Sequence, residues 1–277
     1  MVNKINKMYT TAFLMGGLGN QMFQIANAYA QSLKNNLDCF FRPNSQTPHQ
    51  GKNTSEYIPN IFRKLNFKDE LTNYQTYHET NWHYEPRNIL WSNSIEFYGY
   101  YQSSKNFLTY REEIKDLFSI DEPTKKYLLE KYPELLLDNT LSIHIRKGDY
   151  KKFPEIHPTI SKSYIDEALT TVGEYSHVFI FSDDKTWIEE NLNFQNSIIV
   201  DENDYVELWL MSMCKNNILS NSSFSWWGSY LNRNENKIVV APSIWFGPKG
   251  PKIFKDIYED DWKIINVSFS KGELKVI

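Results

Sequence analysis

Hydrophobic and polar positions change along the chain in a pattern that predicts short strands followed by helices. Residues 11–15 form an apolar run, and the apolar residues between 22 and 33 then recur at helical spacing. A glycine-rich turn over residues 16–21 separates the two segments. We therefore predict a strand, a tight turn and a helix at the start of the chain, with a second strand over residues 37–41.

The same pattern returns in the second half of the chain. Apolar runs predict strands over residues 141–143, 178–181, 197–200 and 237–241, and helical spacing predicts helices over residues 161–172 and 205–214. In the first half, helices are expected over residues 103–118 and 123–131, whereas residues 42–98 are polar, aromatic and poorly periodic and are interpreted as long loops with a few short elements. The alternation predicts an α/β protein with parallel sheets in two Rossmann-like lobes, residues 1–135 and 136–277.

Composition narrows the class of protein. Thirty basic against 34 acidic side chains give a net charge of −4, which argues against a nucleic-acid-binding surface. Two cysteines, Cys39 and Cys214, are too few for a disulfide framework or a thiolate metal site and fit a reducing cytosol. No apolar stretch is long enough to span a bilayer, and the first eight residues lack a signal-peptide core. We expect a cytoplasmic protein.

The most informative polar cluster follows the apolar run at residues 141–143. Residues 144–150 contain Arg146, Lys147 and Asp149, and the ends of parallel strands are where open α/β sheets place ligand-binding groups. The guanidinium of Arg146 could grip a pyrophosphate through two parallel hydrogen bonds. The alternative is a local ion pair between Arg146 and Asp149 in a surface turn.

Three other turns carry polar groups that suit a nucleotide. Asp183 follows the predicted strand over residues 178–181 and could accept hydrogen bonds from a ribose or a purine edge, or it could cap the next helix. The serines of residues 220–225 could donate hydrogen bonds to a phosphate, or they too could cap a helix. The turn over residues 16–21 allows close approach of a ligand, although Met22 stands where the dinucleotide fingerprint requires glycine.

Five motifs, over residues 16–24, 99–103, 144–150, 181–184 and 220–227, together resemble glycosyltransferase family 11, the α-1,2-fucosyltransferases. The resemblance runs from about Thr11 to Pro248. It implies a GT-B-like fold whose two lobes face a central crevice, with the donor GDP-L-fucose on the second lobe and a galactoside acceptor on the first. It also implies inversion at the anomeric carbon and no metal or other cofactor. No Asp-x-Asp spacing of the metal-dependent glycosyltransferases occurs in the chain.

The resemblance also assigns roles to residues. In this assignment the catalytic residues are Arg146, Asn20 and Asp149, the donor-binding residues are His144, Arg146, Asp183, Ser222, Ser223 and Phe224, and the acceptor-binding residues are Gln21, Tyr101 and His157. Asp149 and His157 are both candidate bases, and a loose transition state could also need no base. The chain departs from many relatives at Lys147, where they have a second arginine, and this puts a phosphate contact at that position in doubt.

The expected function is transfer of fucose to O2 of a terminal galactose on an oligosaccharide or a lipid-linked glycan. One alternative is a fucosyltransferase with another regiochemistry or acceptor. Another is a non-catalytic protein that binds a nucleotide sugar or a glycan, which the 16% share of aromatic residues would also suit. A lipid-linked acceptor would bring a cytoplasmic enzyme into peripheral contact with the inner face of the plasma membrane.

Overall fold

The structure is a computed structural model that describes residues 7–45, 47 and 51–277. The chain divides into two compact units. The first extends to Ser119 and includes Lys255–Ile257, and the second comprises Ile120–Phe254 and Tyr258–Ile277. The division lies at 119/120 instead of the expected 135/136, so residues 120–135 belong with the second unit.

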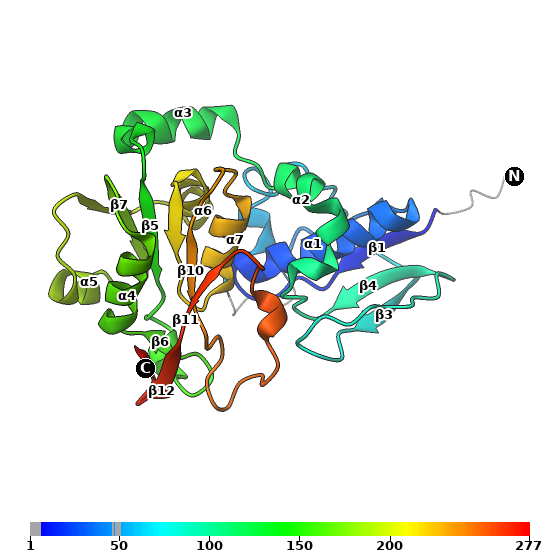
Figure 1. Cartoon of the computed structure of the whole chain (residues 1–277). Helices are drawn as coiled ribbons and strands as arrows, with labels where there is room; N and C mark the ends of the chain where they lie inside the picture. Colours follow the sequence, from blue (N-terminus) through cyan, green and yellow to red (C-terminus); the bar gives the residue numbers. More distant parts are fainter. Residues whose placement is uncertain (1–6, 46, 48–50) are drawn as a thin grey trace, which may run out of the picture. The chain divides into compact units, whose positions relative to one another are not determined.

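The first unit contains a parallel four-stranded sheet with the order β2-β1-β4-β3 (Figure 1). Its strands are β1 (Tyr9–Ala12), β2 (Asp38–Cys39), β3 (Tyr74–His78) and β4 (Ser94–Tyr98). Helix α1 (Leu18–Asn35) packs against β1 and buries Met22, Phe23 and Ala26 completely. The predicted strand, turn and helix at the start of the chain are confirmed, with the strand two residues earlier than expected.

Two of these strands, β3 and β4, lie in the stretch that was interpreted as long loops with a few short elements, and neither strand was predicted individually. Strand β4 is buried although Ser94 and Glu96 alternate with its apolar residues, and the Glu96 carboxylate is paired with Arg42 at 2.6 Å. Strand β3 lies at the edge of the sheet and leaves mostly polar side chains in solvent. Neither strand therefore forms a continuous apolar run like those from which the other strands were predicted.

The second unit contains a parallel six-stranded sheet with the order β11-β10-β9-β5-β7-β8. Its strands are β5 (Leu141–Ile145), β7 (Val178–Ser182), β8 (Ser197–Ile199), β9 (Asn216–Ile218), β10 (Val239–Pro242) and β11 (Lys263–Ile265). Helices lie on both sides of this sheet (Figure 1). They are α4 (Lys162–Val172), α5 (Lys185–Asn191), α6 (Asp204–Met213) and α7 (Ser223–Leu231), whereas α3 (Glu122–Lys131) precedes β5 in the chain. The strands and helices predicted for this half are confirmed to within a few residues, and the predicted α/β class holds.

The core of the second unit lies between its sheet and α4. Leu141, Ile143 and Ile145 of β5 are fully buried together with Ile165 and Ala168 of α4. Side-chain caps start the helices: the Ser161 hydroxyl accepts the Tyr164 N–H, and the Asp184 carboxylate accepts the Trp187 N–H. A parallel strand buried on both faces and a helix with one apolar stripe are the expected partners in such a sheet.

Short elements complete the fold. A three-stranded sheet with the order β12-β13-β6 contains β6 (Thr159–Ile160), β12 (Val267–Ser270) and β13 (Glu273–Val276). The helix expected over residues 103–118 is broken into 3-10 turns followed by α2 (Arg111–Leu117). The 3-10 turns are η1 (Thr54–Glu56), η2 (Ser104–Asn106), η3 (Leu108–Tyr110), η4 (Pro133–Leu136), η5 (Tyr150–Lys152) and η6 (Lys255–Ile257).

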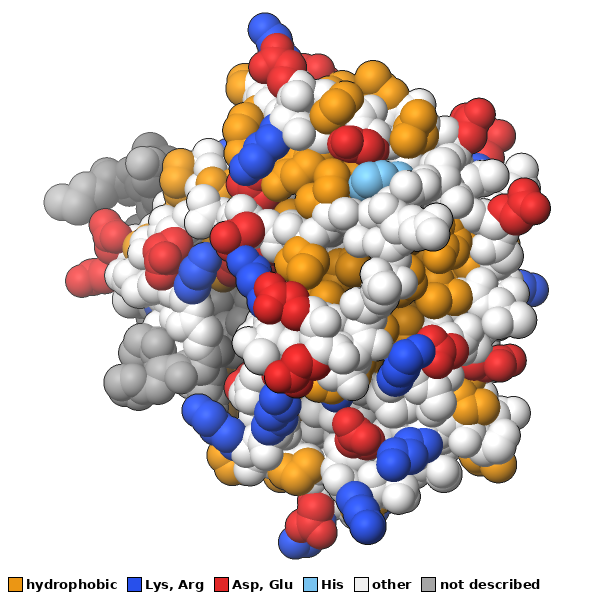
Figure 2. Space-filling model, turned by 90° about the vertical axis from the view of Figure 1, so that its left-hand side faces the viewer, with side chains coloured by type: hydrophobic (Ala, Val, Ile, Leu, Met, Phe, Trp, Pro, Cys, Tyr) orange, Lys and Arg blue, Asp and Glu red, His pale blue; other side chains and the backbone are white. Residues whose placement is uncertain are grey.

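Charged side chains of both signs are interspersed over the face of the second unit on which α4 and α5 lie (Figure 2). The i,i+4 pair of Lys162 and Asp166 on α4 and the pair of Lys185 and Asp201 are examples. This face therefore lacks the basic surface that binding of a nucleic acid requires.

Candidate functional site

The predicted donor-binding residues lie at one edge of the second sheet. From β5 the chain continues through β7 and β8 on one side and returns to β9 on the other, so the strand order reverses between β5 and β9. Ligands of open α/β sheets bind beyond the carboxyl ends of the strands at such a switch point. His144 and Arg146 come from the end of β5, Asp183 from the end of β7, and residues 220–224 follow β9.

His144 connects the two strands at the switch point. Its Nδ1 lies 2.7 Å from the Ser220 Oγ, and its ring centroid is 5.4 Å from that of Phe224. Burial, together with the charge of Arg146, lowers the pKa of His144 to about 3. The imidazole is thus neutral at any working pH, and its predicted contact with a donor would be a neutral hydrogen bond or a packing contact.

Arg146 is held through its Nε, and its two terminal guanidinium nitrogens have no partner among the described residues. Its Nε lies 2.9 Å from the Asp149 Oδ1 and 3.1 Å from the Asp183 Oδ2. Among the described residues, none hydrogen-bonds the two terminal nitrogens of Arg146. Partial burial opposes the charge, but Asp183 and Asp149 raise the pKa of the guanidinium, which stays protonated. The ion pair with Asp149 that was the alternative interpretation is present, and it leaves both terminal nitrogens for bidentate binding.

Asp183 organises the turn that carries Arg146. Its Oδ1 accepts the backbone N–H groups of Lys147 at 2.9 Å and Gly148 at 3.0 Å. A Cβ atom at position 148 would lie 2.8 Å from the Asp183 Oδ2, so a larger residue there would displace the carboxylate. The carboxylate is therefore engaged within the protein, and its contact with a nucleoside stays a prediction.

Lys147 points away from this edge. Its side chain is 2% exposed, and its Nζ lies 3.3 Å from the Glu273 Oε1 and 4.1 Å from the centroid of the Trp187 ring. Burial lowers the pKa of the Lys147 ammonium, although Glu273 opposes the shift. The lysine thus has a contact inside the unit, which is a physical reason to exclude it from a phosphate clamp.

The serine loop is tied to the start of α7. Ser222 is the N-cap, and its hydroxyl accepts the Phe224 N–H at 3.3 Å, so the capping alternative is observed for this serine. Ser223 and Phe224 are half-buried in the first turn of the helix. The Asn221 side chain is buried and donates to the carbonyls of Pro158 and Trp245. The N-terminus of α7 remains suited to an anion, because the helix dipole favours negative charge there.

Tyr150 joins the arginine turn to the serine loop, a role that was not predicted. Its hydroxyl donates to the Asn221 carbonyl at 3.1 Å, and the Arg146 Cζ lies 5.8 Å from its ring centroid. Burial raises the pKa of Tyr150 to about 12. His157 stacks on Tyr150 with the two ring centroids 4.8 Å apart, and burial lowers the pKa of His157. The position of Tyr150 in the motif over residues 144–150 was the available signal.

In the first unit, Asn20 lies at the equivalent switch point, between β1 and β4. It occupies the first turn of α1, and a Cβ atom at Gly16, where φ is +78°, would lie 2.6 Å from the Asn20 Nδ2. Gln102, which follows β4, donates its amide N–H to the Asn20 Oδ1 at 2.8 Å. The glycine turn therefore fixes the position of the Asn20 amide.

Gln21 and Tyr101, predicted to contact an acceptor, are fully buried in this unit. The Gln21 side chain donates to the Gly16 carbonyl and accepts from the Thr54 hydroxyl. The Tyr101 hydroxyl donates to the Tyr77 carbonyl at 3.1 Å. Both side chains stabilise the turns beside Asn20. Because they are buried, an acceptor would contact residues next to them.

Two further properties concern only the part of the chain that the structure describes. No group of three or more His, Cys, Asp or Glu side chains there is placed to hold a metal ion. Within the same residues, none of the helices combines the length and the apolar character needed to cross a bilayer.

Comparison with known sequences identifies relatives across nearly the whole chain. The family model described as "Glycosyl transferase family 11" matches residues 1–266. An α-1,2-colitosyltransferase of Escherichia coli is 32% identical over 270 residues, which cover 85% of this chain and 91% of that protein. A galactoside α-(1,2)-fucosyltransferase 2 of Gorilla gorilla gorilla is 24% identical over 262 residues, which cover 87% of this chain and 74% of that protein.

Comparison with solved structures bears on the fold. The fucosyltransferase NodZ from Bradyrhizobium superposes with a TM-score of 0.51 at 11% sequence identity, covering 80% of this chain and 92% of that chain. The predicted GT-B-like class with parallel sheets is thereby confirmed.

Proposed function

The chain belongs to glycosyltransferase family 11, and from this premise we propose that it transfers L-fucose from GDP-L-fucose to O2 of a terminal galactoside, forming an α-1,2 linkage with inversion. The observation that carries the proposal is the Arg146 guanidinium, which Asp149 and Asp183 hold through Nε while its two terminal nitrogens have no partner among the described residues. This fork lies at the switch point of the second sheet, where a diphosphate is expected.

The chemistry assigns the two units different tasks. The acceptor hydroxyl forms a bond to the anomeric carbon as the bond from that carbon to the diphosphate breaks, and the hydroxyl proton passes to a base or to solvent. Negative charge grows on the departing GDP, where Arg146 and the N-terminus of α7 would stabilise it. Asn20 in the first unit would orient the acceptor. The reaction requires no resident cofactor, and GDP-fucose acts only as a substrate.

The identity of the acceptor belongs to the same proposal. The name of the gorilla relative supports a galactoside, on either an oligosaccharide or a lipid-linked glycan. A lipid-linked acceptor would bring the enzyme to a membrane surface. Assays with free and lipid-linked galactosides distinguish these two forms of the acceptor.

A second donor is favoured by one specific observation. The relative with 32% identity is named a colitosyltransferase, and colitose is fucose without the hydroxyl at C3. A site that hydrogen-bonds this hydroxyl would reject colitose strongly, whereas a site with apolar groups there would reject fucose only weakly. The donor sugar therefore depends on how one hydroxyl is recognised.

Initial rates of GDP release test the proposal. GDP-fucose, GDP-colitose and GDP-mannose should be compared at equal concentration, with lactose as the acceptor and EDTA present. We expect the largest kcat/KM with GDP-fucose. Preference for GDP-colitose would move the chain to the second donor, and binding of GDP-fucose without GDP release in any assay would indicate a non-catalytic binding protein.

A further inference from the structure

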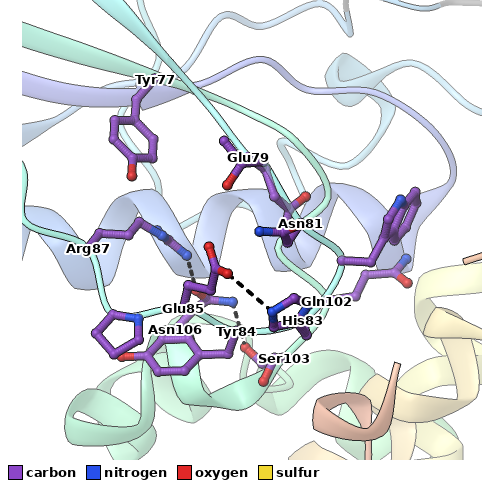
Figure 3. Close-up of a pocket in the computed structure, with 13 residues that line it drawn as sticks. Tyr77, Glu79, Asn81, His83, Tyr84, Glu85, Arg87, Gln102, Ser103 and Asn106 are labelled. Atoms are coloured by element: carbon purple, nitrogen blue, oxygen red, sulfur yellow. Dashed lines mark hydrogen bonds and ion pairs between the residues drawn. The ribbon is translucent and has the colours of Figure 1, made fainter. Parts of the chain in front are cut away.

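The first unit carries a polar pocket that none of the roles above uses (Figure 3). It lies beyond the carboxyl ends of β3 and β4 and is open to solvent. Glu79, Asn81, Glu85 and Arg87 point towards a shared space in the close-up. Trp82 and Gln102 also line the pocket.

The wall of the pocket is fixed before any ligand binds. The backbone N–H groups of Tyr100 and Tyr101 donate to the Glu79 carboxylate at 2.7 and 3.0 Å. Tyr101 has a φ of +52°, and a Cβ atom at Gly99 would lie 2.3 Å from the Glu79 Cβ. A turn held in such a strained conformation indicates a functional constraint.

Several polar groups of the pocket already have partners within the protein. Arg87 donates to the Asn27 Oδ1 at 2.7 Å and to the Asn106 amide oxygen, and its Cζ lies 4.6 Å from the Tyr101 ring centroid. The His83 Nε2 lies 3.2 Å from the Glu85 Oε1. With its guanidinium already engaged and two carboxylates present, the pocket suits a neutral ligand rich in hydroxyl groups better than a phosphate.

An aromatic surface lies beside these polar groups. The Trp82 side chain is 41% exposed and stacks on Tyr100 with ring centroids 5.3 Å apart and an angle of 20° between the rings. A hexose presents an apolar face of C–H groups and a rim of hydroxyls, so it needs both a flat ring and hydrogen-bonding partners.

Gln102 connects the pocket to Asn20. Its Nε2 donates to the Asn20 Oδ1 at 2.8 Å. Its Oε1 is buried and accepts no hydrogen bond from any residue that the structure describes. A buried amide oxygen without a partner costs free energy unless a ligand or a water supplies a donor.

We propose that this pocket is the acceptor subsite, in which Trp82 packs against the apolar face of a neutral sugar and Gln102 accepts a hydrogen bond from one of its hydroxyls. Through the same side chain, Gln102 is a positioning residue that links the bound acceptor to Asn20. The assignment to an acceptor rests on the proposed function, whereas binding of a neutral sugar in the pocket can be tested without it.

The experiment compares Trp82→Ala with Trp91→Ala, which removes the same ring from the same segment outside the pocket. The acceptor KM for lactose and the Kd for GDP are measured for both variants and the wild type. We expect Trp82→Ala to raise the acceptor KM roughly three- to tenfold while the Kd for GDP stays unchanged. Trp91→Ala should match the wild type in both measurements. An unchanged acceptor KM in Trp82→Ala, or an equal change in Trp91→Ala, would overturn the proposal.

Gln102→Met tests the link to Asn20. We expect kcat to fall at saturating acceptor and donor, with the Kd for GDP unchanged, because the Asn20 Oδ1 loses the hydrogen bond that the Gln102 Nε2 donates. Retention of the wild-type kcat would remove Gln102 from its positioning role.

A readout that does not require turnover separates this proposal from the proposed function. Saturation-transfer NMR with lactose detects sugar binding to the wild type and to Trp82→Ala even when no donor is transferred. Signals that are present with the wild type and lost in Trp82→Ala support the pocket, even if GDP-fucose proves not to be a substrate. Absence of lactose signals with the wild type, or equal signals with both proteins, would refute it.

Discussion

Arg146 and Lys147 are neighbouring cations with opposite surroundings. The Arg146 side chain is 36% exposed at the edge of the second sheet, whereas that of Lys147 is 2% exposed inside the unit. The Asp183 carboxylate accepts hydrogen bonds from the backbone N–H groups of Lys147 and Gly148 and so fixes the turn. The fixed turn directs the two neighbouring side chains to opposite sides. One charge is therefore available to a ligand, and the other is used in packing.

Replacement of Arg146 should impair turnover more than the fold. We expect Arg146→Ala to lower kcat on the order of 10² to 10³, the effect typical for loss of one preorganised donor to developing charge. Arg146→Lys should not restore the rate, because an ammonium lacks the planar fork. Arg233→Ala, an exposed arginine of the same unit, is the control. A kcat for Arg146→Ala near that of the control would remove Arg146 from the mechanism.

His144 should make the stability of the protein depend on pH. Its pKa is about 3 in the folded chain and near 6.5 in the unfolded chain, so below pH 6.5 only the unfolded state takes up this proton. The contribution of His144 to the free energy of unfolding is therefore fully present above pH 6.5, and it is lost as the pH falls towards 3. Urea denaturation should show that the wild type loses about 2 kcal/mol more between pH 7.5 and pH 5 than His144→Gln does. Equal losses would contradict this assignment.

The candidate bases can be separated by their pH profiles. Asp149 is engaged with Arg146, and His157 is a stacked imidazole whose pKa is lowered by burial. Loss of the residue that accepts the proton should change the pH profile of kcat. We expect the acidic limb of kcat to change in Asp149→Asn or in His157→Ala, but not in both. Profiles that match the wild type in both variants would exclude the two residues and favour a transition state that needs no base.

At the scale of elements, the hairpin of β12 and β13 couples the end of the chain to the arginine turn. It begins at Val267, directly after the last residue of the family match, and pairs with β6 through β13. Leu274 is fully buried in the core, and the Glu273 carboxylate lies 3.3 Å from the Lys147 Nζ. Lys147, the residue next to Arg146, is thus held by the β12–β13 hairpin, which lies outside the region matched by the family model.

A double-mutant cycle tests this coupling. Glu273→Gln should lower the free energy of unfolding by about 1 kcal/mol, because the buried Lys147 ammonium loses its partner while half-exposure of Glu273 limits the effect. In a Lys147→Met background the same change should have almost no effect. Calorimetric GDP titration of Lys147→Met should give a Kd within about twofold of the wild type. Additive unfolding energies or a large loss of GDP affinity would contradict the structure.

Elements with a clear apolar pattern could be predicted from the sequence, whereas those stabilised by distant partners could not. Strands β5 and β7 are buried runs, and helices α1 and α4 carry apolar stripes, so local periodicity was sufficient. Strand β4 instead buries Glu96 against Arg42, which is 54 positions earlier in the chain. An ion pair between residues so far apart in the sequence cannot be predicted from local periodicity.

The candidate site shows the same limit. Arg146 was identifiable because its motif is contiguous, but the burial of Tyr101 and Gln21 depends on how separate turns pack around α1. Gln102 was within a recognised motif, yet its contact with Asn20 joins residues 82 positions apart. Residue type and spacing gave the chemistry of the site, and the direction of each side chain required the structure.

At the scale of the whole molecule, each unit has a hydrogen bond between two side chains at the switch point of its parallel sheet. His144 reaches Ser220 in the second unit, and Asn20 reaches Gln102 in the first. Each unit therefore offers one preorganised site at the edge of its sheet. A transferase requires two such sites, one for the donor and one for the acceptor. The proposed division assigns the nucleotide to the arginine turn and the sugar to the pocket beside Gln102.

Product analysis tests the central claim most directly. GDP-fucose and lactose are incubated with the enzyme in EDTA, and the linkage and anomeric configuration of the product are determined by NMR. We predict one trisaccharide with α-L-fucose on O2 of galactose and one GDP released for each molecule formed. Absence of transfer, fucose on another hydroxyl, or activity that appears only when magnesium or manganese is supplied would contradict the account.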